Sequence, residues 1–121
     1  MAAERFQRAL ELDPQEQRKL LAHLEEVDAA TFEANRQVLA RTVGRVDVRT
    51  FKRLASAAAN ARAHWVAAAV EMTEKAASAS PADIARLAAL RTAYEEMTQV
   101  YDAVRRMVER GYLCYLDIAE R

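Results

Sequence analysis

The fold is decided by residues 81–118, which read PADIARLAALRTAYEEMTQVYDAVRRMVERGYLCYLDI. Alternating steps of three and four residues along this stretch give a line of ten positions, nine of which are apolar or aromatic. That spacing places them on one face of a long helix. We call this line the C-terminal seam, and its positions are Leu87, Leu90, Tyr94, Met97, Tyr101, Val104, Val108, Gly111, Tyr115 and Ile118.

The length of this stretch bears on the shape of the molecule. As one helix, residues 81–118 would be about 57 Å long, because each residue adds about 1.5 Å. A compact chain of this size is only about 35 Å across. We therefore expect an elongated molecule, with a bend or a short separate helix after Gly111, since glycine is a poor helix former.

The start of this helix carries a capping signal. Ser80 can cap it, Pro81 suits the first helical position, and Asp83 places a carboxylate at the positive end of the helix dipole. Local chemistry and apolar spacing therefore predict the same element.

A second long helix is predicted from Pro14 to about Val43. Asp13 is its expected cap, Glu16 can reach back to that cap, and Gly44 is expected to end the helix in a left-handed conformation. Its apolar face is wide enough to touch two neighbouring helices. One stripe on that face is Leu20, Leu24, Val27, Thr31, Ala34 and Val38, and the adjoining stripe is Leu21, Phe32, Leu39 and Val43.

A third long helix is predicted to begin after Asp47, its expected cap, and to end near Ser78. Alanines alternate with large side chains along its apolar face, so a neighbouring helix can approach closely at some levels. The positions on this face are Phe51, Leu54, Ala58, Ala61, Trp65, Ala68 and Met72.

Composition agrees with an all-helical chain, because the 121 residues include only two glycines and two prolines. We predict one all-α domain over residues 1–121, an elongated up-and-down bundle of three long helices. Short terminal helices, including one over residues 2–12, would make it a three- or four-helix bundle. The steps of three and four are also those of a coiled coil.

The sequence predicts a cytoplasmic protein. No apolar run is long enough to span a membrane, and the first residues lack the basic-then-apolar order of a signal peptide. The single cysteine cannot form an internal disulfide, which fits a reducing compartment.

The net charge is zero, but its distribution along the chain is uneven. Residues 1–35 carry eight acids and four bases, whereas residues 36–64 carry seven bases and one acid, Asp47. The central basic segment is an alternative site for a nucleic acid or another anionic partner, although it lacks interleaved aromatic residues. The candidate anion-binding residues cluster around the turn near residue 45, and they are Arg41, Arg45, Arg49, Lys52 and Arg53.

The two histidines raise the question of chemistry. In a helical hairpin turning near Arg45, His23 and His64 would lie within about one turn of each other, with acidic residues nearby. Positions on the flank of the bundle explain both histidines without special chemistry, and we assign no metal, cofactor or catalytic residue. His64 on a small helical bundle superficially resembles histidine phosphotransfer domains, but WVAA follows it where those domains place a lysine and then a glycine.

The tyrosines suggest an interface, because each has an apolar ring and a polar tip. Residues 112–118 are apolar on almost every side. If they extend past the bundle, another protein surface is expected to bury them. We therefore expect a non-catalytic interaction, adaptor or chaperone-like module that self-associates as a homodimer through its C-terminal helix. The expected partner-binding residues are Tyr94, Tyr101, Tyr112, Tyr115 and Ile118, and phosphotransfer at His64 and anion binding are the alternatives.

Overall fold

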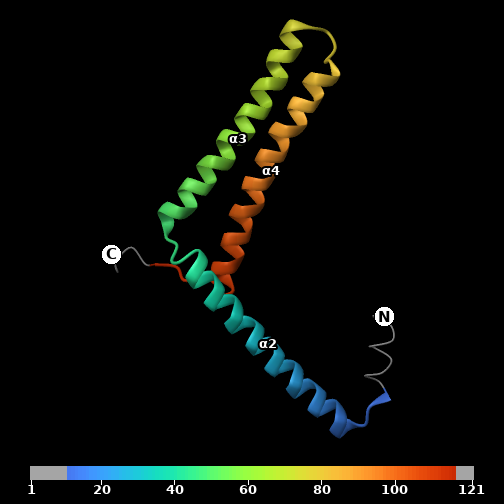
Figure 1. Ribbon diagram of the computed structural model, residues 1–121, viewed down its shortest axis with the longest axis vertical. Helices are drawn as coiled ribbons and strands as arrows, with labels where there is room; N and C mark the ends of the chain where they lie inside the picture. Colours follow the sequence, from blue (N-terminus) through green and yellow to red (C-terminus); the bar gives the residue numbers. More distant parts are fainter. Residues whose placement is uncertain (1–10, 117–121) are drawn as a thin grey trace. The chain divides into compact units, whose positions relative to one another are not determined.

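The computed structural model describes residues 11–116 and contains three long α-helices in that range (Figure 1). They are α2 (Pro14–Thr42), α3 (Val48–Lys75) and α4 (Pro81–Glu109). The all-α class is confirmed, and each helix begins at the predicted residue or next to it. The helix expected over residues 2–12 falls almost entirely outside the described residues.

Capping side chains fix these starting points. Asp47 Oδ1 accepts hydrogen bonds from the backbone N–H groups of Arg49 and Thr50 at 2.8 and 3.1 Å, and Thr50 Oγ1 accepts from Asp47 N at 3.2 Å. Ser80 and Asp83 form the same reciprocal arrangement, with both bonds at 3.1 Å. Each capping box pairs backbone donors that the helix itself leaves unpaired.

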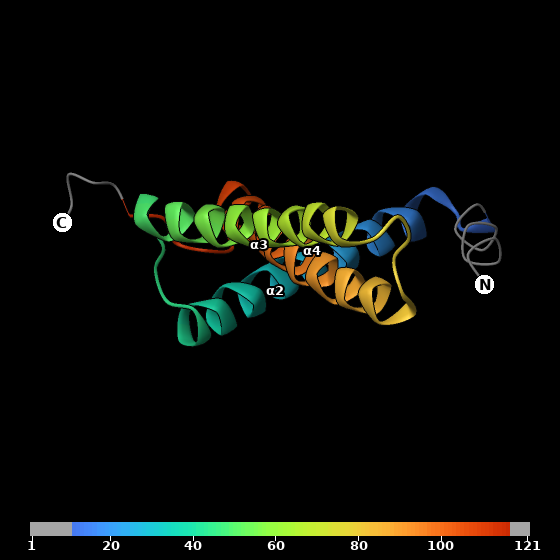
Figure 2. The same cartoon turned by 90° about the horizontal axis from the view of Figure 1, so that it is seen from above.

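A boundary after Val38 divides the chain into two compact units. In the second unit, residues 39–121, α3 and α4 pack as an antiparallel hairpin and lie side by side in two perpendicular views (Figures 1 and 2). The helical part of the C-terminal seam, from Leu87 to Val108, is half-buried throughout, and Ala68 of α3 is 3% exposed. The predicted apolar face of α4 therefore packs against α3.

Aromatic rings join the two helices at two levels. Trp65 and Tyr94 stack with ring centroids 6.0 Å apart and an interplanar angle of 16°. Nearer the start of α3, Phe51 meets Tyr101 edge to face at 5.9 Å and Tyr115 at 6.1 Å. Such pairs add to the free energy gained by burying the ring surface.

The end of α4 differs from the prediction. The helix ends at Glu109, and Gly111 takes a φ of +79°, which only glycine adopts without strain. The amides of Tyr112 and Leu113 turn back to the carbonyl of Met107, at 2.8 and 3.2 Å. The expected change of direction at Gly111 is thus present, whereas a separate helix after it is wrong for residues 112–116.

These last described residues pair with the loop between α2 and α3. Val46 N donates to Cys114 O at 3.0 Å, and Leu116 N donates to Val46 O at 2.9 Å, giving a parallel bridge between Val46 and Tyr115. Val46 is 2% exposed and Leu113 3% exposed. With Ala68, they are the only buried residues among those described. We call residues 112–116 and their pairing with Val46 the C-terminal clasp.

The first unit contains most of α2. This helix buries none of its residues, and its apolar side chains include Leu21, Leu24 and Val27 at 60, 48 and 57% exposure. Phe32 is half-buried, with the guanidinium of Arg36 5.9 Å from its ring centroid. The expected packing of three helices into one elongated bundle stays a prediction.

Gly44 should be sensitive to substitution, because its φ is +81° and L-residues with a Cβ avoid this region. Apart from Gly44 and its two neighbours in the chain, no atom lies within 4 Å of a Cβ placed there, so the effect should be conformational. We expect Gly44→Ala to lower the free energy of unfolding by about 1 kcal/mol in urea titrations. Gly44→Asn should cost less, since asparagine tolerates this conformation, and equal costs would contradict the explanation.

The cap of α2 predicts an acid-sensitive helix start. The Glu16 backbone N–H donates to Asp13 Oδ1 at 2.8 Å, and this bond lowers the pKa of the Asp13 carboxyl below its ordinary value. A carboxyl with a lowered pKa stabilises the folded state above its unfolded pKa, and that contribution disappears as the pH falls through the folded pKa. Helical ellipticity should therefore fall on acidification below about pH 4, and Asp13→Ala should remove part of that change.

Candidate interaction surfaces

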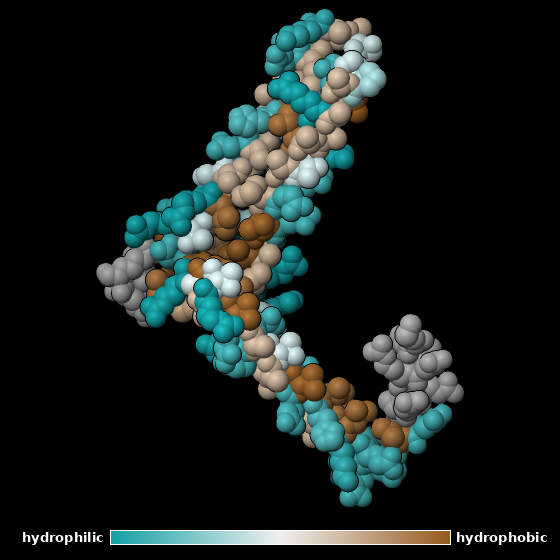
Figure 3. Space-filling view, in the orientation of Figure 1, coloured by the Kyte–Doolittle hydropathy of each residue, from teal (hydrophilic) through white to brown (hydrophobic). Residues whose placement is uncertain are grey.

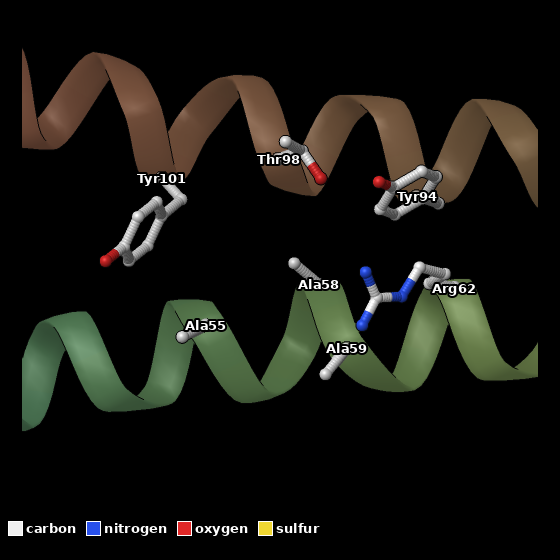
Figure 4. Close-up of a pocket in the computed structure, with 7 residues that line it drawn as sticks. All are labelled: Ala55, Ala58, Ala59, Arg62, Tyr94, Thr98 and Tyr101. Atoms are coloured by element: carbon white, nitrogen blue, oxygen red, sulfur yellow. The ribbon is translucent and has the colours of Figure 1, made fainter.

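The α3–α4 hairpin carries a shallow groove of about 340 Å³ (Figure 4). Three alanines of α3 form one wall, and two tyrosines with a threonine form the other. Arg62 supplies the one charge, and its guanidinium lies between the helices beside Tyr94 (Figure 4). The lining residues are Ala55, Ala58, Ala59, Arg62, Tyr94, Thr98 and Tyr101. Small side chains on one wall allow another backbone to approach closely.

Tyr94 and Tyr101 both lie at this groove, but their rings also pack within the chain. Tyr94 stacks on Trp65, and Tyr101 meets Phe51. Both residues are half-buried. They therefore help to join α3 to α4, and their role in binding a partner stays a prediction.

The other predicted partner-binding residues belong to the C-terminal clasp or follow it. Tyr112 is half-buried, and Tyr115 is 43% exposed while its ring contacts Phe51. Leu113 is buried. The chain itself thus covers part of the surface for which we expected an outside cover. Ile118 lies outside the described residues.

The five predicted anion-binding residues all lie in the second unit and are all exposed: Arg41, Arg45, Arg49, Lys52 and Arg53. None of them forms an ion pair with a described residue. Asp47, the nearby acid, directs its carboxylate to the α3 cap. Positive charges in the first turns of α3 also face the positive end of its dipole. The cluster is therefore a concentrated positive surface.

Neither histidine belongs to a group of described side chains that could bind a metal ion. His23 and His64 are exposed and lie in different units. Within residues 11–116, no group of three or more His, Cys, Asp or Glu side chains is arranged to hold a metal ion. Cys114 is an exposed thiol in the C-terminal clasp. Phosphotransfer at His64 stays a prediction.

The exposed apolar face of α2 is the surface that sequence reasoning placed inside the bundle. Figure 3 shows hydrophobic side chains gathered along α2. Arg62 is one of the seven bases of residues 36–64, and its sequence neighbours do not distinguish it from the others. The spacing of the apolar residues of α2 identifies this face in the sequence, but spacing alone does not say whether the face is covered.

Over the part of the chain that the structure describes, no helix has the length and apolar character needed to cross a membrane. Comparisons with family models, curated proteins and solved structures give no match to this chain.

Proposed function

We propose that this chain is a non-catalytic protein–protein interaction module, of an adaptor or chaperone-like kind, and that α2 supplies its main binding face. The observation that carries this proposal is the exposure of the apolar residues of α2. Leu20, Leu21, Leu24, Val27 and Val38 are each 36–60% exposed. By contrast, the apolar face of α4 is half-buried against α3.

The pattern on α2 fits the recognition of another helix. Leu20, Leu24 and Val27 follow steps of four and three, which is the spacing by which one helix packs along another. Exposed apolar residues that gather on one face are typical of a protein–protein interaction site. A helix-in-groove contact would use it in full.

Photo-crosslinking can test this function. A benzophenone amino acid introduced in place of Leu24 should form an adduct with the bound protein in cells of the source organism, and mass spectrometry would identify the linked peptide. The same group in place of Gln37, an exposed polar position on α2, is the matched control. Equal labelling from both positions, or none from position 24, would contradict the proposed binding face.

A second candidate function is the binding of a polyanion, such as a nucleic acid, by the basic cluster. It is favoured by the five exposed bases, which lack ion-pair partners among residues 11–116. Phosphate groups would supply the missing charge and release counterions on binding.

Salt-dependent binding to a labelled RNA or DNA duplex tests this second function. Neutralising Arg45, Arg49 and Lys52 should weaken binding about tenfold or more and reduce its salt dependence by about three charges. Neutralising Arg86, Arg91 and Arg105 on α4 is a control with the same change in net charge. The same loss in both variants would indicate only non-specific attraction.

A further inference from the structure

We propose that the partner of α2 is a second copy of this chain, and that α2 of each copy lies in the α3–α4 groove of the other. This inference rests on the proposed function and names the occupant of the same binding face. It rests on a match in width, length and charge between α2 and the α3–α4 hairpin, whose groove lies between residues 55–62 and 94–101.

The width of the apolar face on α2 suits a site made by two helices. Its two adjoining stripes, one through Leu20 and Leu24 and the other through Leu21 and Phe32, exceed what a single neighbouring helix covers. The groove presents two helices, with Ala55 to Arg62 on one side and Tyr94 to Tyr101 on the other. A third helix seated there completes a three-helix core.

The length of α2 also matches the lengths of the two helices of the hairpin. α2 has 29 residues, α3 has 28 and α4 has 29. A docked α2 can therefore run along the whole hairpin without an overhang at either end.

The third match is between opposite charges at the middle of α2 and at the middle of α3. Asp28 is the central residue of α2, and Arg62 lies at the centre of α3. When equal helices lie fully alongside one another, their centres are level whether they run parallel or antiparallel. Asp28 follows Leu24 by four residues, so it stands on the apolar side of α2. The carboxylate would thus meet the guanidinium of the groove.

Both charges are available for this pairing. Asp28 and Arg62 are exposed, and neither forms an ion pair or hydrogen bond with a residue in the described range. Inside a helix–helix contact, a charge of either sign costs free energy unless an opposite charge meets it. The pair would therefore act mainly on specificity, by fixing which groove accepts α2 and at what level.

A second copy explains the exposure better than a separate partner does. α2 buries none of its residues within one chain. A two-fold dimer repeats the helix-in-groove contact, and two contacts bring the interface toward the roughly 1,200–2,000 Å² of stable complexes. The receptor that matches α2 in length and charge is already present in the same sequence.

Sedimentation equilibrium of the full chain is the first test, and a dimer is expected at micromolar concentration. Asp28→Arg and Arg62→Asp should each raise the dimer Kd about tenfold or more, because each places two like charges at every contact. Arg53→Asp, which reverses a base of α3 outside the groove, should change the Kd less than threefold. Circular dichroism of each variant would verify that its helices are intact.

Mixing the two single variants gives the decisive result. In a mixed dimer, each contact again joins one acid to one base, so the mixture should dimerise within about threefold of the wild-type Kd although neither variant does so alone. If each α2 instead folded into the groove of its own chain, mixing would restore nothing. That outcome, or a wild-type chain that remains monomeric, would overturn the inference.

The proposed interaction function does not depend on self-pairing, and the two can be tested separately. A monomeric chain whose position-24 photo-crosslink joins a different protein would retain the interaction function and lose the self-pairing. Absence of any crosslink and of a dimer would reject both.

Discussion

Replacement of Trp65 by alanine should destabilise the hairpin by about 3 kcal/mol, the low end of the range for truncating a large aromatic core residue. Trp65 is half-buried and stacks on Tyr94 at 6.0 Å, so the substitution removes both apolar burial and a ring pair. Because only three of the described residues are buried, the hairpin has little other packing to compensate. The loss is a large part of the stability of a small domain.

Urea denaturation followed by circular dichroism at 222 nm measures this effect, since Trp65 is the only tryptophan and its fluorescence is lost in the variant. His64→Ala is the matched control, because His64 is the exposed neighbour of Trp65 on the same helix. It should change the free energy of unfolding by less than about 0.5 kcal/mol. Equal midpoints for Trp65→Ala and the wild type would show that the stack does not hold α3 to α4.

The second large effect is expected at Leu113. This side chain is 3% exposed, and Leu113→Ala should cost about 3 kcal/mol through lost burial and the cavity left behind. The substitution should also release the C-terminal clasp, because Leu113 is the buried residue that fixes this segment to the hairpin. The helices themselves should persist.

Hydrogen exchange can separate the release of the clasp from general unfolding. The amides of Val46 and Leu116 donate the two hydrogen bonds of the bridge, and both should exchange faster in Leu113→Ala. Amides in the middle of α3 should change less. Cys114→Ser alters the exposed neighbour and should leave both bridge amides protected. Unchanged protection in Leu113→Ala would contradict a clasp held by this side chain.

The sequence predicts features that depend on neighbouring residues. Asp47 and Ser80 cap their helices as expected, because a cap is set by chemistry within three or four residues. The positive φ of Gly44 follows equally from local signals. The apolar spacing of the C-terminal seam also identifies the side of α4 that packs on α3.

The features that sequence did not predict depend on distant residues. Residues 112–116 have apolar side chains that fit a helix, yet Tyr115 pairs with Val46 from the other end of the second unit. Nothing within a few positions of Tyr115 encodes that choice. Similarly, the stripes of α2 predict an apolar face but do not say which chain covers it. The tyrosines Tyr94 and Tyr101, expected to bind a partner, line the same groove as Arg62, which the sequence did not single out.

The bridge between Val46 and Tyr115 has a kinetic consequence. The pairing of α3 with α4 closes a short connection and can form early, whereas joining Val46 to Tyr115 closes a loop that contains the whole hairpin. The segment that makes this closure is also the last of the described residues to leave the ribosome. During synthesis, the junction between α2 and α3 therefore stays unpaired until residues 112–116 have left the ribosome.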